Sequence, residues 1–316
     1  KMKICPISYL ACDEDYSKEG LKRLSPSLSC LEKLPFNDEE LIQEAALRST
    51  KISVQGVQPK LSAILKPREN KFVIVNIGGR YLIKPQNPQF PQLPENEDLT
   101  IRLAKIAGLS VPMHGLLYTK TNTLVYFIKR FDRVGRKKIA VEDFSQLSGK
   151  TRDTKYDSSM EQVVGIIDQY CTFPVIEKLK LFHLILFNFL VGNEDMHLKN
   201  FSLIQNGLKY QLSPGYDLLN TTIMLPDGAE EIALPIKGKK RNLNGKLLVR
   251  YFGQERLGLT EKTIQTVLNK LNAATPIWKK IIEISFLSKD LKGKYISLIG
   301  KRLLSLNQGL PKKFLS

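Results

Sequence analysis

The chain has 316 residues, of which 42% are hydrophobic and 25% charged. These values are typical of a globular protein that buries a substantial core, with length for about two domains. Lys and Arg number 48 against 31 Asp and Glu, a formal net charge of +17, which indicates either an anionic partner, such as nucleotide phosphates, nucleic acid, an acidic protein or a membrane surface, or a generally basic background. The longest apolar run, 181–192, is shorter than the roughly 20 residues of a membrane-spanning helix, and the sequence opens without a signal-peptide pattern. A membrane protein is therefore not expected.

The cysteines and histidines argue against a structural zinc site. The four cysteines show no C-x-x-C spacing, and none of the three histidines lies within four residues of a cysteine. Free thiols are typical of a reducing compartment. We therefore expect a cytoplasmic protein, with export into another cell as the alternative.

The first part of the chain predicts short helices and then a strand-rich region. Asn37-Asp38 is typical of a helix start before the apolar run 41–47. Alternating runs predict strands at 51–57, 60–65, 72–77 and 81–84, separated by Gly and Pro. An acidic start and one apolar face predict a helix over 95–108. Two further strands are predicted at 115–118 and 124–131.

After about residue 133, helical periodicity dominates. Helices are predicted at 141–147, 159–170 and 175–192, and three more within 260–306. Asn206-Gly207 separates the apolar runs 201–204 and 208–212, which is the strongest short signal for a β-hairpin. The sequence thus predicts a strand-rich lobe over residues 1–132 and a helical lobe with one embedded hairpin over residues 133–316.

The segment that follows the helix 175–192 has a pattern typical of phosphate chemistry. Asp195 and Asn200 are five residues apart on a loop between a buried helix and a hairpin, which is how protein kinases place a catalytic Asp and a metal-binding Asn. The hairpin then leads to Asp217, so oxygen ligands can converge on Mg²⁺ and phosphate. Asp and Asn are also common in turns. The combination of spacing, hairpin and third ligand favours the metal site over a polar loop.

A strand lysine in the first lobe adds to this pattern. Kinases hold ATP phosphates with such a lysine, paired to a helix glutamate, and Lys84 ends the run 81–84. Glu97 is the best candidate partner and Glu95 the next. Taken singly, Lys84 is typical of a snorkelling surface lysine, and Glu97 of a charge in the first turn of a helix. The loop 53–60 has one glycine, Gly56, and its backbone N–H groups are candidates to hold phosphate oxygens.

Together these segments resemble the HipA family of serine/threonine kinases, the toxins of bacterial toxin–antitoxin modules. The matching segments run in order along most of the chain: ISVQGVQPK (52–60), LIK (82–84), ENE (95–97), KRFDR (129–133), EDFSQL (142–147), GNEDMHLKNFS (192–202) and LSPGYD (212–217). The resemblance implies an α+β, bilobal protein-kinase-like fold and a kinase that uses ATP and Mg²⁺.

The resemblance also implies roles for individual residues. Asp195 would be the catalytic aspartate, and Asn200 and Asp217 the metal ligands. Lys84 would be the ATP lysine, with Glu97 beside it. The strand around Lys129 and Phe131 would present its backbone to adenine, with Asp132 near the ribose, and the family's autophosphorylated serine matches Ser53. The remaining nucleotide-binding positions would be Gly56, Val57, Gln58, His197 and Lys199.

The family further suggests a substrate and partners. We expect transfer of the ATP γ-phosphate to an aminoacyl-tRNA synthetase, and hence inhibition of translation. Full-length members carry an additional N-terminal subdomain before the point where this chain begins, so the chain resembles the short members. For these we expect two partners, a separate small protein like that subdomain and a DNA-binding antitoxin. Some short members carry a second loop serine, at the position that Gln55 occupies here.

A second interpretation is an ATP-binding, nucleic-acid-associated regulator, either a pseudokinase or a repressor component. The net charge favours nucleic-acid binding, but no helix-turn-helix, zinc finger or aromatic single-strand platform is visible. The presence of Asp195, Asn200 and Asp217 argues against a pseudokinase. The basic stretch 237–250 has six Lys or Arg and no acid. It is either a contact for an anionic substrate or, as we favour, a solvated helix face.

Overall fold

The computed structural model describes residues 3–49, 59–135, 137–151, 153–225, 230–311 and 314. The chain divides into two compact units. Unit 1 comprises Lys1–Leu99, Pro112–Arg136 and Ile284–Leu287, and unit 2 comprises Thr100–Val111, Lys137–Glu283 and Ser288–Ser316. Helix α3 (Leu93–Ile106) has its first part in unit 1 and its last in unit 2. None of the helices among the described residues could span a membrane.

Unit 1 is built on a five-stranded antiparallel sheet in the order β4-β3-β5-β7-β6. Its strands are β3 (Leu61–Lys66), β4 (Lys71–Ile74), β5 (Tyr81–Lys84), β6 (His114–Tyr118) and β7 (Leu124–Lys129). Before the sheet come the short pair β1 (Lys3–Ile4) and β2 (Ala11–Cys12) and helices α1 (Lys18–Leu24) and α2 (Asp38–Ser49). A 3₁₀ turn, η1 (Pro67–Glu69), joins β3 to β4, and β8 (Arg133–Val134) follows β7. The predicted strand 51–57 lies outside the described residues.

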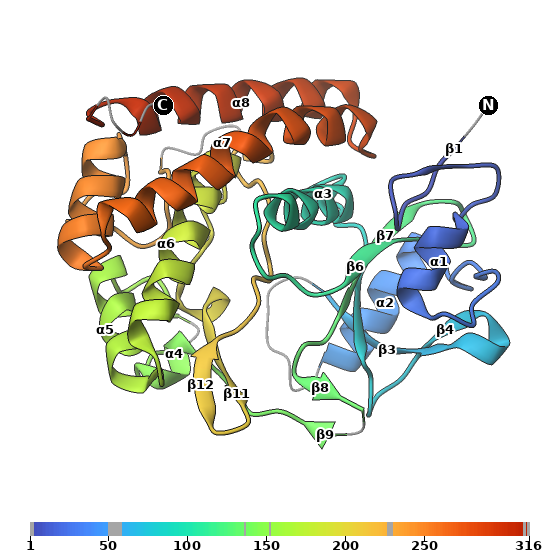
Figure 1. Ribbon diagram of the computed structural model, residues 1–316. Helices are drawn as coiled ribbons and strands as arrows, with labels where there is room; N and C mark the ends of the chain where they lie inside the picture. The colour runs from blue at the N-terminus through green and yellow to red at the C-terminus, as the bar shows by residue number, and fades with distance from the viewer. Residues whose placement is uncertain are drawn as a thin grey trace. The chain divides into compact units, whose positions relative to one another are not determined.

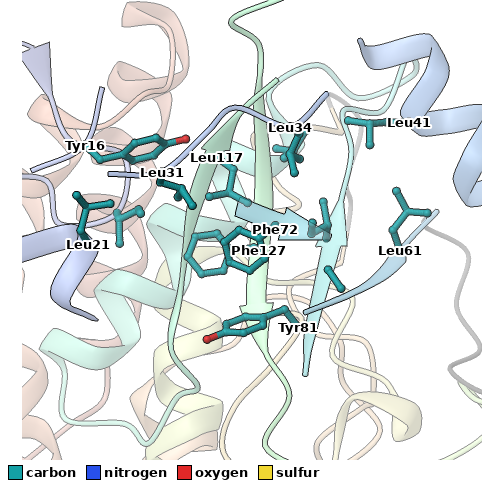
Figure 2. Close-up of a cluster of buried hydrophobic side chains, with 14 of the residues drawn as sticks. Tyr16, Leu21, Leu31, Leu34, Leu41, Leu61, Phe72, Tyr81, Leu117 and Phe127 are labelled. Carbon is teal, nitrogen blue, oxygen red and sulfur yellow. The ribbon is translucent and has the colours of Figure 1, made fainter. Parts of the chain in front are cut away.

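The core of unit 1 follows from strand alternation. Successive side chains of a strand face opposite sides of the sheet, so Tyr81 and Ile83 of β5 share one face, and Val125 and Phe127 of β7 share it with them. Residues of α1, α2 and the N-terminal segments complete this buried cluster (Figure 2). The alternate residues of β5 and β7, including Lys84 and Tyr126, face the other side of the sheet.

Unit 2 is mostly helical. Its longest buried helix is α6 (Pro174–Val191), which packs against α5 (Met160–Tyr170) and α8 (Lys289–Asn307) (Figure 1). The rest comprises β9 (Lys137–Lys138), β10 (Val141–Asp143), α4 (Phe144–Leu147), η2 (Leu198–Asn200), β11 (Ser202–Asn206), β12 (Lys209–Leu212), a π-helical segment η3 (Lys246–Arg256) and α7 (Glu261–Ile284). Strands β10, β11 and β12 form an antiparallel sheet.

Two predictions for unit 2 are wrong in detail. The predicted helix 141–147 is a strand up to Asp143, because Val141–Asp143 pairs with β11. Asp143 then caps α4, with its carboxylate accepting from the backbone N–H of Gln146 at 2.8 Å. The region 260–306 has two helices instead of three, since α7 continues through Pro276. Burial of Leu271 before that proline and of Trp278 after it keeps one continuous apolar face.

Candidate active site

Lys84 is a buried ion-pair residue at the end of β5. It is 5% exposed, and its Nζ lies 2.6 Å from Oε1 of Glu97 on α3, which is 1% exposed. The Nζ also lies 5.6 Å from the ring centroid of Tyr126, directly across the sheet on β7. A charge of this kind is stable in the interior only when it is paired. Lys84 is therefore not a snorkelling surface lysine, and Glu97 is the glutamate that it contacts.

Glu95, the second candidate partner, makes a separate contact. Nε2 of Gln86 donates to both of its carboxylate oxygens at 3.0 Å, and also to the carbonyl of Leu124 at 2.8 Å. Burial raises the pKa of Glu95 to about 7. On the same helix, Asp98 Oδ1 lies 2.8 Å from His114 Nδ1 on β6. The start of α3 is thus tied to the sheet through both Glu97 and Asp98.

The predicted adenine and ribose positions follow β7. Lys129 is its last residue and has an exposed side chain, and Phe131 is half-buried. Asp132 accepts from Arg130 at 2.7 and 2.9 Å and also pairs with Arg133. Burial by itself raises the pKa of Asp132, but the two guanidinium groups outweigh that effect and hold the pKa below its usual value. Asp132 is therefore an ionised carboxylate at neutral pH.

Residues 53–58 of the predicted phosphate-covering loop lie outside the described residues. The described chain resumes at Pro59, and β3 begins two residues later, antiparallel to β5. Four of the predicted site residues lie outside the described residues: Gly56, Val57, Gln58 and the expected phosphosite Ser53.

In unit 2, the loop of interest starts where α6 ends. Gly192 has φ +71°, a left-handed conformation that terminates helices and that glycine adopts without strain. Its carbonyl accepts from the backbone N–H groups of Thr221 at 2.9 Å and Thr222 at 3.1 Å. The start of the loop is thereby fixed to the segment that follows Asp217.

Asp195 and Asn200 are joined within this loop. Nδ2 of Asn200 donates to the backbone carbonyl of Asp195 at 2.8 Å, and the backbone N–H of Asp195 donates to Oδ1 of Asn193 at 3.2 Å. The main chain of Asp195 is thus held from both sides. Its carboxylate Oδ1 accepts a hydrogen bond from the hydroxyl of Tyr156, in the segment between α4 and α5.

His197 is buried beside Asp195, with 6% of its surface exposed. Nζ of Lys155 lies 2.8 Å from its Nε2, while its Nδ1 has no hydrogen-bond partner among the described residues. Burial lowers the pKa of His197, and the charge of Asp195 opposes that effect without cancelling it. Lys199 is half-buried, and its carbonyl accepts from Tyr216 at 2.9 Å.

The hairpin brings Asp217 to the same part of unit 2. Its turn is Gly207-Leu208, one residue later than predicted, because Asn206 pairs with Lys209. Asp217 follows Tyr216, whose buried hydroxyl bonds both the Lys199 carbonyl and the hydroxyl of Ser202 at the start of β11. Tyr216, the residue before Asp217, is therefore bonded directly to Lys199, the residue before Asn200. Asp217 has φ +51°, an uncommon conformation for a residue other than glycine.

The donor atoms of this region suit Mg²⁺. Because Nδ2 of Asn200 is engaged by Asp195, the amide oxygen is the atom left for a ligand, and Asp217 adds carboxylate oxygens. Mg²⁺ takes oxygen ligands and is commonly held by only one or two protein groups together with phosphate and water. In the part of the chain that the structure describes, no three His, Cys, Asp or Glu residues gather into a metal cluster. Asn200 and Asp217 therefore offer oxygen ligands of the kind that hold Mg²⁺ together with phosphate and water.

Sequence reasoning missed several contacts of the loop. Lys155 and Tyr156 lie about 40 residues before it, and Arg302, on α8, lies 3.5 Å from Glu194 and pairs with Glu231. Glu194 also accepts from the hydroxyl of Thr222 at 2.7 Å. No fixed spacing in the sequence relates these residues to Asp195, so only the folded chain shows them.

The basic stretch 237–250 is a solvated face, as predicted, but only its last part is helical, since 237–244 form turns and bends and η3 begins at Lys246. Lys237, Lys239 and Arg241 are exposed, whereas Leu243 and Leu248 are buried. Lys240 pairs with Glu230 at 3.2 Å. Leu243 and Leu248 are therefore core residues, and most of the charges of the stretch face solvent.

Comparison with known proteins gives a consistent result. The model of the HipA-like C-terminal domain family matches residues 52–278. A Haemophilus influenzae protein named "Putative kinase" is 32% identical over 222 residues, which is 66% of this chain and 64% of that protein. The serine/threonine-protein kinase toxin HipA of Shewanella oneidensis is 27% identical over 206 residues, 59% of this chain and 47% of HipA.

Solved structures match the fold. The structure of Shewanella oneidensis HipA, determined with HipB and operator DNA, gives a TM-score of 0.68 at 20% identity and covers 88% of this chain and 73% of that one. The Helicobacter pylori proinflammatory kinase CtkA gives 0.53 at 18% identity, over 72% of this chain and 87% of CtkA. The fold is thus the α+β, bilobal fold of these kinases, as the sequence predicts.

The fold is therefore of the kinase-like class. The chain belongs to the HipA-like C-terminal domain family, whose model covers well over half of it. It spans about half to two thirds of the length of the curated relatives that it matches.

Proposed function

We propose that this chain is an ATP-dependent serine/threonine protein kinase. The observation that carries the proposal is the loop after α6, where the Asn200 amide bonds the Asp195 carbonyl at 2.8 Å. That bond holds a candidate base and a candidate metal ligand on one short loop, in the order that phosphoryl transfer by kinases requires. The buried pair of Lys84 and Glu97 supports the same function.

Each residue then has a distinct task. The Asp195 carboxylate accepts the proton of the substrate hydroxyl as the hydroxyl oxygen attacks the γ-phosphorus and the bond to the β–γ bridging oxygen breaks. Lys84, oriented by Glu97, binds the α- and β-phosphates. Asn200 and Asp217 bind magnesium, which when present neutralises charge on the phosphate oxygens. Positioning and electrostatics carry most of the rate enhancement in this chemistry.

The remaining predicted positions complete the nucleotide site of the proposal. Residues 1–132 supply the phosphate loop, the ATP lysine and the adenine-binding strand, with the backbone around Lys129 and Phe131 and the carboxylate of Asp132. Residues 133–316 supply the base and the metal ligands. His197 and Lys199 add polar groups toward the phosphates.

The biological part of the proposal is a toxin that phosphorylates an aminoacyl-tRNA synthetase and blocks translation. It is supported by the name of the Shewanella oneidensis relative, a kinase toxin. HipA of that organism has been solved with HipB and operator DNA, which favours a DNA-binding antitoxin as one partner here. A separate small protein like the N-terminal subdomain is the second proposed partner.

The test is transfer of labelled γ-phosphate from Mg-ATP to proteins of a cell lysate. Asp195→Asn should lower the transfer rate about a thousandfold, because it removes the base while keeping the shape of the side chain. Asp290→Asn, on the exposed surface of α8, is the matched control and should transfer at the normal rate. Normal transfer by Asp195→Asn would refute the assignment, and binding to random DNA without any transfer would favour the regulator.

Autophosphorylation can be measured on the same protein samples. We expect mass spectrometry to find phosphate on Ser53 after incubation with Mg-ATP, and not in the Asp195→Asn protein. A phosphate adds a charge of about −1.5 to −2, which next to ATP phosphates would weaken nucleotide binding. Phosphate found only on other residues would contradict this part of the proposal.

A further inference from the structure

Two consecutive residues outside the predicted site, Lys155 and Tyr156, contact the loop of Asp195 at several points. The hydroxyl of Tyr156 bonds Asp195 Oδ1, and the Tyr156 ring meets the His197 ring edge-on at 5.1 Å between centroids. Nζ of Lys155 lies 2.8 Å from His197 Nε2, and its carbonyl accepts from the backbone N–H of Leu198 at 3.3 Å. All of these residues belong to unit 2.

The bond from Tyr156 orients the Asp195 carboxylate. Burial and the negative charge of Asp195 both raise the pKa of Tyr156, so its phenol stays protonated and donates. The bond occupies Oδ1, and no described residue bonds Oδ2. A carboxylate held at one oxygen presents the other in a defined direction. Small errors in the position of a reacting group cost large factors in rate.

The contact from Lys155 decides which nitrogen of His197 carries the proton. An ammonium group has donors and no acceptor, so Nε2 must accept and the proton of the neutral ring lies on Nδ1. That nitrogen is buried and has no partner among the described residues. A buried donor without a partner is destabilising, and such a group calls for an explanation. A phosphate oxygen is a strong acceptor that would satisfy it.

We propose that Lys155 and Tyr156 are positioning residues of the phosphotransfer site, an inference that rests on the kinase function proposed above. Tyr156 holds the Asp195 carboxylate in the orientation that accepts the substrate hydroxyl. Lys155 holds His197 in the tautomer whose Nδ1–H donates to a phosphate oxygen of the nucleotide. A tyrosine that only blocked the Asp195 carboxylate from the substrate hydroxyl would make the same contact. Removing a blocking hydroxyl would raise the rate of phosphotransfer, whereas removing a positioning hydroxyl would lower it.

The first test is Tyr156→Phe, which removes only the hydroxyl. Steady-state kinetics should show kcat lowered about 10- to 100-fold, with the Kd for Mg-ATP unchanged within about twofold, because Tyr156 acts through Asp195 and not on the nucleotide. Tyr170→Phe, an exposed tyrosine on α5, is the matched control and should leave both values unchanged. An unchanged or higher kcat in Tyr156→Phe would overturn the positioning role.

The second test reads the tautomer directly and needs no phosphotransfer. Nitrogen NMR of ¹⁵N-histidine-labelled protein should show that Nδ1 of His197 is protonated and Nε2 is not. The His197→Gln variant assigns the His197 signals among those of the three histidines. Lys155→Met should shift the ring toward the Nε2–H form and weaken binding of Mg-ATP, and Lys155→Arg, which keeps a donor, should restore both. The same tautomer in wild type and Lys155→Met would overturn the role of Lys155. A wild-type protein with the expected tautomer but no phosphotransfer would instead refute the kinase function.

Discussion

Lys84 is a common residue type in an uncommon, buried environment. On the sequence alone it is one of 48 basic residues, and most lysines lie at the surface with their charge in water. Here strand alternation sends the side chain to the face opposite the core cluster, where it is 5% exposed and 2.6 Å from Glu97. A buried pair of this kind costs desolvation and is weak evidence for stability as such. Its place in the fold therefore points to function.

A double-mutant cycle should reveal this pairing. Lys84→Met leaves the Glu97 carboxylate buried without its lysine contact and should lower the free energy of unfolding by about 3–5 kcal/mol. The double variant Lys84→Met/Glu97→Gln should recover at least about 1 kcal/mol of this in urea denaturation, while ATP binding stays lost. Lys294→Met, from an exposed pair on α8, should change stability by less than about 1 kcal/mol. Additive losses in the cycle would contradict the pairing.

Glu95 should make stability depend on pH. Its pKa of about 7 in the folded chain lies above its ordinary value of 4.5, so between these pH values the folded chain binds more protons than the unfolded chain. The free energy of unfolding should therefore fall as the pH rises through that window, by up to about 3 kcal/mol. Glu95→Gln should reduce the fall in urea denaturation at pH 5, 6, 7 and 8, and burial of Glu194, which also raises its pKa, accounts for part of what remains. The exposed Glu32→Gln should leave the fall as it is in the wild type, and an undiminished slope in Glu95→Gln would contradict the assignment.

At the scale of elements, the end of α6 decides where the loop of Asp195 begins. The helix stops at Gly192 because the chain turns left-handed there and its carbonyl is taken by Thr221 and Thr222. The site leaves no room for a side chain. A Cβ would lie 2.5 Å from Leu298 Cδ2 and 2.6 Å from Thr222 Oγ1. The loop is thus set by packing on α8 and on the segment after Asp217, as well as by its own residues.

Gly192→Ala should be strongly destabilising. Left-handed strain and overpacking together should lower the free energy of unfolding by about 2–4 kcal/mol, and phosphotransfer should fall because the loop shifts. Gly165→Ala, within α5 where a Cβ would meet no atom within 4 Å, should instead be neutral or stabilising by up to about 1 kcal/mol. Chemical denaturation of both variants checks this, and equal midpoints would show that α6 ends for another reason.

At the scale of the whole molecule, each compact unit holds its own group of the proposed site residues. Lys84 and Glu97 belong to unit 1, whereas Asp195, Asn200 and Asp217 belong to unit 2. Each unit keeps its own residues in place through internal contacts, the ion pair in one and the bonded loop in the other. The net charge of +17 favours anionic ligands in general. Magnesium dependence is therefore the property that distinguishes a kinase site from general anion binding.

Mg-ATP should stabilise the protein only when both components are present. Ligand at one hundred times its Kd should add about 2.7 kcal/mol to the free energy of unfolding, and removal of Mg²⁺ by a chelator should cancel most of it. Asp217→Asn should lose the magnesium-dependent part but unfold normally without ligand. Thermal denaturation with ATP, with and without Mg²⁺, measures this. Equal stabilisation by ATP alone would indicate simple charge attraction.

The sequence by itself determined the local features of this protein. The spacing of Asp195 and Asn200, the Asn-Gly hairpin signal and the ordered family segments depend on neighbouring residues, and they were sufficient for the fold class and the family. Strand 141–143 could not be predicted, because it exists only by pairing with β11, 60 residues later. The same holds for α7, since burial of Trp278 and its bond to the Leu103 carbonyl at 3.0 Å keep the helix continuous past a proline.

Only the tertiary structure decided which side chains become buried partners. In the folded chain Lys84 pairs with Glu97, and Gln86 donates a hydrogen bond to Glu95, although both glutamates lie at the start of the same helix. The tertiary structure also brought Lys155 and Tyr156 onto the loop of Asp195. The physical reason is that hydrogen bonds and ion pairs act over a few ångströms, whereas the residues that make these four contacts are 9 to 42 positions apart in the chain.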